Sequence, residues 1–302
     1  MAGLSERRPL AIVTGLAGFT GIHLAEALKA DGWRVVGLDR KACWIGDVEV
    51  RQCNLLNEEE LNREISTLAP RSVIHLAGIS SLTYANIREL YETNIVGTRN
   101  LFDALLTLGS SLQSIVVASS ATIYGNTGGY PLDEMTKPAP ANDYAISKLA
   151  IEYLAKIYSA KLPISLIRPF NYTGKGQTTN FVIPKIVEHF KLRAPNIELG
   201  NINVVREFSD VRRIADAYVR ILSIPGEGDV YNLCSGVGVS LREVISEAVG
   251  ITGHNLAVHI NPALLRDNEV DILVGSCAKL EAAVGPLKKF SIRETLLWMF
   301  EE

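Results

Sequence analysis

A tyrosine, a lysine and two adjacent serines that could serve proton transfer at a carbonyl group stand out in the sequence. Tyr144 and Lys148 are four residues apart, so on a helix they lie on the same face. Ser119 and Ser120 directly follow the apolar run Ser114–Ala118 (SIVVA), which is typical of a buried strand. A phenol can give or take a proton, and a hydroxyl can hold the reacting oxygen. A cation ~4 Å away contributes roughly three pKa units, so we expect Lys148 to bring the pKa of Tyr144 near 7, with burial opposing it.

A second group of residues could hold a phosphate-containing cofactor. The segment Gly15–Gly21 (GLAGFTG) follows the predicted strand Leu10–Thr14 and leads into the predicted helix Ile22–Ala30. Glycines let a pyrophosphate approach the backbone closely, and the helix N-terminus offers free N–H groups and a favourable dipole. Asp39 ends the predicted strand Arg34–Leu38, where a carboxylate can meet ribose hydroxyls. The spacing therefore predicts a dinucleotide site.

Short apolar runs alternate with amphipathic stretches through the first half of the chain. Further strands are predicted at 72–76 and 164–167, and further helices at 58–68, 91–108, 144–159, 181–193, 214–223, 240–249 and 291–299. This alternation predicts an α/β fold with a doubly wound parallel sheet over residues 1–170. Residues 171–302 are expected to form mainly a smaller C-terminal substrate-binding lobe, with some segments returning to the first part.

The overall composition argues against several functional classes. The 302 residues carry a net charge of −3 with 47% hydrophobic residues, so neither a nucleic-acid nor a membrane partner is expected. The four cysteines form no CxxC pair and no histidine lies at ligand spacing from them, so we expect reduced thiols and no metal site. The histidines are expected to lack partners and chemical roles. The N-terminus lacks an apolar signal segment, which favours a cytoplasmic protein.

The GxxGxxG spacing, the single Tyr-x-x-x-Lys and the segment ASSATIYG together resemble the extended short-chain dehydrogenase/reductase family, the NAD-dependent epimerases and dehydratases. The resemblance implies that Ser120, Tyr144 and Lys148 are catalytic, with Ser120 matching the family hydroxyl better than Ser119. It also implies a set of cofactor-binding residues: Gly15, Gly18, Phe19, Gly21, Asp39, Arg40, Asn54, Leu55, Leu76, Ala77, Gly78, Asn94, Tyr144 and Lys148. Asn54 departs from the acidic residue usual in the family.

The cofactor and the role of Asn94 stay open at this point. Asp39 is expected to repel a 2′-phosphate and favour NAD(H), whereas Arg40 beside it leaves NADP(H) possible. Asn94 lies in the family-like stretch TNIVGT, but it could equally form a polar bridge between elements.

The second half resembles the sugar-nucleotide-binding part of the same family. The segments RPFN, NFVIP, REFSDV and PALLRD place four candidate substrate-binding residues besides Ser120: Asn171, Asn180, Arg206 and Arg266. Two arginines suit a diphosphate because each guanidinium can make paired charge-assisted bonds. The resemblance is closest to GDP-6-deoxy-4-keto-mannose reductases, and it implies a homodimer through the helices near Tyr91 and Tyr144.

The residues after Ser120 narrow the expected reaction. Related dehydratases carry an Asp-Glu pair where this chain has Ala121 and Thr122, which cannot do that proton work. We therefore expect NAD(P)H-dependent reduction of the 4-keto group of a nucleoside-diphospho-4-keto-6-deoxyhexose, with GDP favoured and dTDP possible. A nucleotide-hexose 4-epimerase with tightly held NAD is the alternative, followed by a non-catalytic dinucleotide-sensing module.

Overall fold

A large, almost entirely parallel sheet organises the protein. In the computed structural model, which describes residues 8–81, 84–128, 130–265 and 270–301, its strand order is β12-β7-β6-β5-β1-β2-β4-β3. Only β3 runs antiparallel to its neighbour. The strands are β1 Leu10–Thr14, β2 Arg34–Asp39, β3 Cys43–Ile45, β4 Val48–Gln52, β5 Ser72–His75, β6 Ser114–Ala118, β7 Ile164–Pro169 and β12 Val230–Leu233. The order reverses between β1 and β5, which confirms the predicted doubly wound fold and places a ligand crevice beyond the carboxyl ends of these strands.

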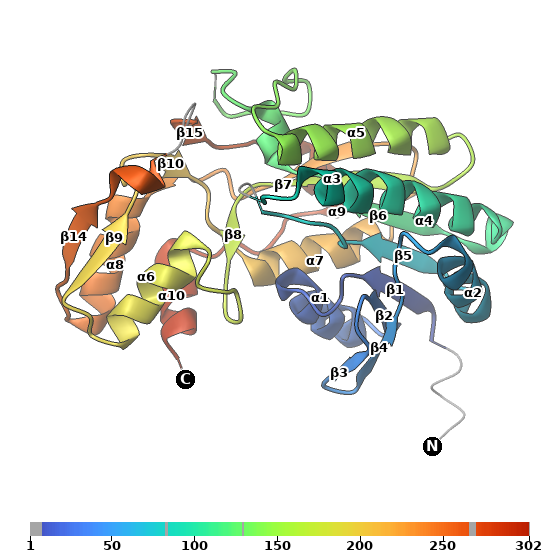
Figure 1. The fold of residues 1–302 in the computed structure, drawn as a ribbon, viewed down its shortest axis with the longest axis horizontal. Helices are drawn as coiled ribbons and strands as arrows, with labels where there is room; N and C mark the ends of the chain where they lie inside the picture. The colour runs from blue at the N-terminus through green and yellow to red at the C-terminus, as the bar shows by residue number, and fades with distance from the viewer. Residues whose placement is uncertain (1–7, 82–83, 129, 266–269, 302) are drawn as a thin grey trace.

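Helices cover both faces of this sheet (Figure 1). One apolar cluster joins one face of the sheet to α1 and α7, and another joins the opposite face to α2, α4 and α5. The helices are α1 Phe19–Ala30, α2 Glu58–Leu68, α4 Gly97–Leu106, α5 Asp143–Tyr158, α7 Val211–Ile221 and α9 Ala278–Val284. Because β12 and α7 come late in the chain, the C-terminal half completes both the sheet and one of its covering layers.

A third apolar cluster lies in a smaller group of elements at one end of the sheet, shown on the left of Figure 1. Its helices are α6 Val182–Lys191, α8 Leu241–Thr252 and α10 Ile292–Phe300. Short strands pair beside them: β9 Asn196–Leu199 with β14 Ala257–Ile260, β10 Val205–Arg206 with β13 Val239–Ser240 and β15 Ile272–Leu273, and β8 Tyr172–Thr173 with β11 Ser209–Asp210. None of these pairs joins the large sheet.

The expected helix over 91–108 is interrupted. It consists of α3 Ile87–Tyr91, a π-helical turn Glu92–Val96 and then α4. The buried Asn94 lies in the middle of the π turn, and its side chain bonds to Ile79 and Ser147 instead of facing solvent. Turns of this type are frequent at functional sites.

His75 has two hydrogen-bond partners, contrary to the expectation from sequence that the histidines lack them. Its Nδ1 lies 2.7 Å from Thr14 Oγ1 and its Nε2 lies 2.9 Å from Thr98 Oγ1, which links β1, β5 and α4. Burial, with a smaller effect of the nearby Lys148, lowers the pKa of His75 to about 3, so the ring is neutral at physiological pH. A structural role follows for this residue.

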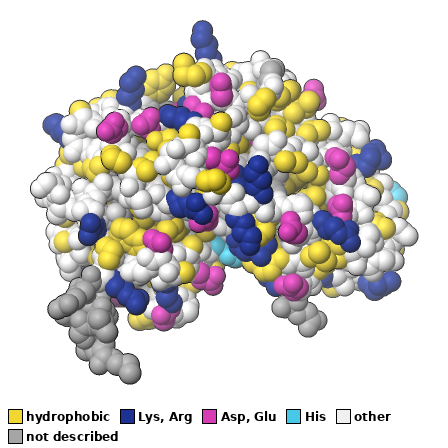
Figure 2. Space-filling model, turned by 180° about the vertical axis from the view of Figure 1, so that it is seen from behind, with side chains coloured by type: hydrophobic (Ala, Val, Ile, Leu, Met, Phe, Trp, Pro, Cys, Tyr) yellow, Lys and Arg dark blue, Asp and Glu magenta, His cyan; other side chains and the backbone are white. Residues whose placement is uncertain are grey.

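Charged side chains of both signs alternate over the face shown in Figure 2, which is indented along its lower edge between the two halves. Among the residues that the structure describes, no helix is long and apolar enough to cross a membrane.

Helix α1 approaches the glycine-rich loop so closely that its packing requires glycine at position 21. A Cβ there would lie 2.5 Å from the Leu16 Cα and closer still to the Leu16 carbonyl oxygen. Gly250 in α8 offers a matched control, because its Cβ would meet only the Arg293 side-chain end at 3.5 Å.

We predict opposite effects for the same substitution in these two helices. Gly21→Ala should lower the free energy of unfolding by about 1–3 kcal/mol through overpacking. Gly250→Ala should raise it by about 0.5–1 kcal/mol, because alanine restricts the unfolded chain and favours helix. Urea denaturation of both variants measures the effects. Equal stabilisation by both substitutions would refute the close approach of α1 to the loop.

Candidate active site

The expected catalytic side chains come together at the carboxyl end of the sheet. Ser119 and Ser120 directly follow β6, and Tyr144 and Lys148 lie in the first turns of α5. Helix α5 begins there because the Asn142 side chain caps it, accepting a hydrogen bond from Ala145 N at 2.9 Å. Lys148 Nζ reaches back to the β6 end and donates to the Ala118 carbonyl oxygen at 2.9 Å.

The two neighbouring serines differ in what their hydroxyls contact. Ser119 Oγ donates to Glu152 Oε1 at 2.6 Å. Because a carboxylate paired with an arginine can only accept, the Ser119 proton is used in this structural bond and is not available to a substrate. Ser120 Oγ instead accepts from Thr122 Oγ1 at 2.9 Å, and Ser120 acts on Tyr144 as a hydrogen-bonding group that lowers the pKa of the phenol. The geometry thus separates the two serines and places Ser120 beside the phenol.

A buried ion pair between Glu152 and Arg168 holds the carboxylate to which Ser119 donates. Arg168 Nε and Nη2, on β7, donate to the two oxygens of Glu152, on α5, at 2.8 and 2.7 Å. Arg168 Nη1 also donates to Tyr124 Oη at 2.8 Å, and Tyr124 donates to Asn232 Oδ1 at 2.7 Å. Each polar group of this hydrogen-bond network has a partner, as a buried charged network requires.

The pKa of Tyr144 differs from the sequence expectation of about 7. Burial raises it to about 12, and the bond with Ser120 lowers it only in part. Lys148 Nζ lies 5.9 Å from the centre of the Tyr144 ring, and burial lowers its own pKa to about 8. Desolvation therefore outweighs the attraction between the two groups, and Tyr144 is a neutral phenol at pH 7.

The glycine-rich loop has the shape that close approach of a phosphate requires. Gly15 adopts a φ of +72°, and a Cβ there would lie 2.9 Å from the backbone of Ala77, in the loop after β5. Gly18 precedes α1, and no side chain caps that helix end. The first N–H groups of α1 can therefore donate hydrogen bonds to an anion.

Asp39 and Arg40 lie at the end of β2, beside this loop. The Asp39 carboxylate accepts from Ala17 N at 3.3 Å and from Arg40 N at 2.7 Å, which fixes its position next to the glycine-rich segment. Arg40 Nη1 lies 3.7 Å from Glu89 Oε1, at a largely exposed position. The carboxylate of Asp39 therefore contacts the glycine-rich loop, whereas the guanidinium of Arg40 pairs with Glu89 of α3.

Asn94 clamps the loop after β5. Its Oδ1 accepts from Ile79 N at 2.7 Å, and its Nδ2 donates to Ile79 O at 3.1 Å and to Ser147 Oγ at 3.0 Å. A Cβ at Gly78 would lie 2.9 Å from Asn94 Oδ1 and 3.7 Å from Lys148 Nζ. Asn94 therefore shapes the site through the backbone of Gly78, and this is the polar bridge left open by the sequence.

Other expected cofactor residues surround the same loops. Leu76 and Ala77 form the segment that packs on Gly15, and Thr14 Oγ1 accepts from Ala77 N at 3.2 Å. Leu55 is buried, and its carbonyl oxygen accepts from Asn100. Asn54 uses its Oδ1 locally, accepting from Leu56 N at 3.1 Å.

The expected substrate residues of the second half are less uniform. Asn171 and Asn180 are exposed. Arg206 Nη1 donates to the carbonyl oxygens of Val205 at 2.9 Å and Asp271 at 3.1 Å, so this guanidinium holds the chain at the start of β15. Arg266 lies outside the described residues. A role of Arg206 and Arg266 at a diphosphate stays a prediction.

Tyr172 and Glu152 belong to the site although sequence reasoning did not single them out. Tyr172 Oη lies 2.7 Å from Thr20 Oγ1, and its ring stacks on Phe19 with centroids 6.0 Å apart, which connects β8 to the start of α1. Glu152 lies eight residues after Tyr144 on the buried face of α5. The sequence signal that could have identified Glu152 is a carboxylate on the helix face that is otherwise apolar.

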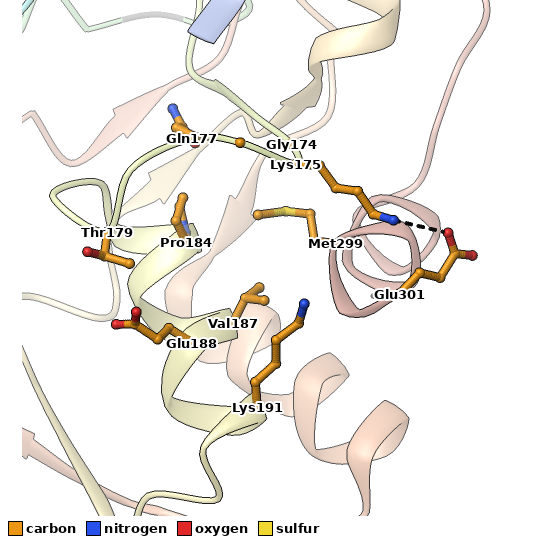
Figure 3. Close-up of a pocket in the computed structure, with 11 residues that line it drawn as sticks. Gly174, Lys175, Gln177, Thr179, Pro184, Val187, Glu188, Lys191, Met299 and Glu301 are labelled. Atoms are coloured by element: carbon orange, nitrogen blue, oxygen red, sulfur yellow. Dashed lines mark hydrogen bonds and ion pairs between the residues drawn. The ribbon is translucent and has the colours of Figure 1, made fainter.

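A separate hollow of about 290 Å³ lies between α6, α10 and the loop after β8 (Figure 3). Lys175 on this loop forms an ion pair with Glu301 at 3.5 Å across its rim. Neither Ser120 nor Tyr144 lines this hollow, so it is not part of the candidate active site.

Together, the glycine-rich loop, the uncapped helix end and Asp39 fit a dinucleotide, with its pyrophosphate at α1 and its adenosine ribose at Asp39. The same edge of the sheet carries Ser120, Tyr144 and Lys148. The arrangement can therefore bring a dinucleotide and a proton-transfer group to one carbonyl carbon.

Comparison with known proteins agrees with this geometry. The model of the NAD dependent epimerase/dehydratase family matches residues 11–234. GDP-6-deoxy-D-talose 4-dehydrogenase of Aggregatibacter actinomycetemcomitans is 29% identical over 291 residues, covering 96% of each chain. GDP-6-deoxy-D-mannose reductase of Pseudomonas aeruginosa is 32% identical over 297 residues, covering 94% of this chain and 93% of the relative.

Solved structures are similar over almost the whole chain. A Burkholderia cenocepacia J2315 protein described as a candidate epimerase superimposes with a TM-score of 0.91 at 43% identity, covering 97% of both chains. RMD from Pseudomonas aeruginosa, solved with NADPH, gives 0.85 at 30% identity and the same coverage. These matches confirm the family expected from the motifs: the chain belongs to the NAD dependent epimerase/dehydratase family of extended short-chain dehydrogenases/reductases.

Proposed function

We propose that the protein is an NAD(P)-dependent nucleotide-sugar oxidoreductase that reduces the 4-keto group of a nucleoside-diphospho-4-keto-6-deoxyhexose. The observation that carries this proposal is the convergence of Ser120, Tyr144 and Lys148 beside a dinucleotide-binding loop. Both curated relatives described above are named for redox chemistry on GDP-6-deoxy sugars, which favours GDP as the nucleotide.

The protonation state of Tyr144 suits the reductive direction. Reduction of a ketone needs a proton on oxygen, and a phenol with a pKa raised to about 12 holds its proton at pH 7. The bound nicotinamide would supply the hydride. Ser120 would hold the same oxygen, and the Lys148 ammonium, fixed by the Ala118 carbonyl, would stabilise the phenolate that remains.

The residues around Ser120 argue against elimination of water. Ala121 has no ionisable group, and the Thr122 hydroxyl donates to Ser120 Oγ. Dehydration at the sugar C5 and C6 needs a separate acid and base. The 6-deoxy-4-keto sugar would therefore be made by another enzyme before it reaches this site.

NAD(H) is the cofactor we favour. The Asp39 carboxylate beside the loop would accept bonds from ribose hydroxyls and repel a 2′-phosphate. Arg40, which could neutralise that phosphate, already has Glu89 as an ion-pair partner. NADP(H) stays possible because this pair is exposed and weak, and because the similar RMD structure contains NADPH.

A nucleotide-hexose 4-epimerase is the second candidate. The Burkholderia cenocepacia protein, 43% identical, is described as a candidate epimerase, and the same Ser, Tyr and Lys could serve both reactions. An epimerase retains its NAD, whereas a reductase exchanges it each turnover. The two proposals therefore differ in net consumption of reduced cofactor.

We also propose that two copies of the chain pair through α4 and α5. Tyr153 and Ile157 on α5 are 65% and 71% exposed, and Ile146 and Val96 are exposed beside them. Tyr158 of α5 donates to Asp103 of α4 at 2.6 Å, so the two helices present one surface. An exposed apolar stripe on adjacent helices is typical of a subunit interface.

A spectrophotometric assay tests the proposed reaction. Purified protein should oxidise NADH with GDP-4-keto-6-deoxymannose, more slowly with the dTDP-linked 4-keto-6-deoxyglucose, and with a lower kcat/KM for NADPH. Product analysis would identify the C4 configuration. Failure to oxidise either cofactor, combined with interconversion of UDP-glucose and UDP-galactose and release of NAD on denaturation, would replace the reductase proposal with the epimerase.

Removal of one hydroxyl tests the acid. Tyr144→Phe keeps the ring but removes the transferable proton, so kcat should fall by roughly a hundredfold or more. The dissociation constant for the cofactor, measured by fluorescence, should change little. Tyr153→Phe on the exposed face of the same helix is the control and should retain full turnover. A kcat of Tyr144→Phe within a few-fold of the wild type would remove Tyr144 from the mechanism.

Sedimentation equilibrium tests the pairing. The wild type should show twice the chain mass at micromolar concentration, and Ile157→Glu should shift it toward the monomer because a charge cannot be buried there without a partner. Leu192→Glu, at another exposed apolar position far from α5 in sequence, should leave the mass unchanged. A monomeric wild type would contradict the proposed interface.

A further inference from the structure

Two hydrogen-bond donors converge on the Ser120 hydroxyl, and both belong to Thr122. Thr122 N lies 3.2 Å and Thr122 Oγ1 lies 2.9 Å from Ser120 Oγ. The first bond is the cap of the 3-10 turn Ala121–Tyr124, which any residue could complete. The second comes from the Thr122 side chain, which the turn does not need.

The number of bonds that a hydroxyl can make gives this pair a chemical consequence. A serine hydroxyl has one hydrogen and two acceptor lone pairs. With both lone pairs directed at Thr122, Ser120 has its hydrogen left to donate. Ser120 is also the hydrogen-bonding group that lowers the pKa of Tyr144 against the effect of burial. Ser119 cannot exchange roles with it, because its own hydrogen goes to Glu152.

We propose that Thr122 is a positioning residue that fixes Ser120 as a hydrogen-bond donor toward the Tyr144 oxygen and, resting on the proposed function, toward the substrate carbonyl oxygen. A donor at these two oxygens stabilises negative charge on either of them, which is what proton transfer in each direction requires. Thr122 does not exchange a proton with the substrate, because its hydroxyl donates to Ser120.

Several other groups act on Tyr144 besides Ser120. Lys148 lies on the same helix, while Tyr172 of β8 and the buried Tyr218 of α7 interact with it electrostatically. None of them contacts Thr122 through a hydrogen bond in the described part of the chain. A change at Thr122 should therefore reach Tyr144 through Ser120.

Two substitutions separate the hydroxyl of Thr122 from its shape. Thr122→Val keeps the shape and the backbone N–H but removes the side-chain donor, and it should lower kcat about five- to tenfold, the worth of one neutral hydrogen bond. KM should change less than about twofold. Thr122→Ser restores the hydroxyl and should recover kcat to within about twofold. In the oxidative direction, the pH at which the rate reaches half its maximum should rise in Thr122→Val.

A double-mutant cycle distinguishes positioning from a general effect on the fold. In a Ser120→Ala background, Thr122→Val should have no further effect on kcat, because the hydroxyl it positions is gone. The melting temperature and the cofactor dissociation constant of Thr122→Val should match the wild type. An equal loss of kcat in both backgrounds, or no loss in Thr122→Val, would overturn the proposal.

Crystal structures of the wild type and of Thr122→Val test the proposal without any turnover. The Ser120 side chain should occupy a single rotamer in the wild type and more than one in the variant. A single unchanged rotamer in the variant would overturn the positioning role. If the wild type reduces no sugar nucleotide, the proposed function fails, whereas this structural comparison still decides the role of Thr122.

Discussion

The buried ion pair between Glu152 and Arg168 is the interaction on which the active-site geometry depends. It joins α5 to β7, and Ser119 connects the end of β6 to the same carboxylate. Burial alone would lower the pKa of Arg168, but its bonds with Glu152 raise it, so the charge persists inside the protein. Removing one partner would leave the other buried and unpaired, which typically costs about 3–5 kcal/mol.

Burial also sets the electrostatics of the proton-transfer groups. Burial disfavours the charged form of each group, so it raises the pKa of Tyr144 and lowers the pKa of Lys148. Tyr144 is thus held as an acid, while Lys148 remains largely charged below pH 8. Burial thus moves these two pKa values, which are similar in the free side chains, in opposite directions, and perturbed pKa values of this kind are typical of sites that transfer protons.

The sequence predicted the elements that have a strong local signal. Strand β1 matches its predicted bounds, and the spacing of Tyr144 and Lys148 predicted their common helical face. Tertiary contacts decided the rest. The π turn at Asn94 exists because that side chain bonds to Ile79 and Ser147, which no local pattern records. The pKa of about 7 that the sequence predicted for Tyr144 was wrong, because the desolvation of the phenol depends on the packing around it.

In the proposed reaction, Tyr144 supplies a proton to a carbonyl oxygen while a reduced nicotinamide supplies hydride to the carbon. Mass spectrometry of the sugar-nucleotide product formed with NADH carrying deuterium at both C4 positions tests it most directly. We expect one deuterium on the sugar C4 in every product molecule, with the same labelled product formed about a hundredfold more slowly by Tyr144→Phe. A product without deuterium from the cofactor would contradict hydride transfer to the sugar C4.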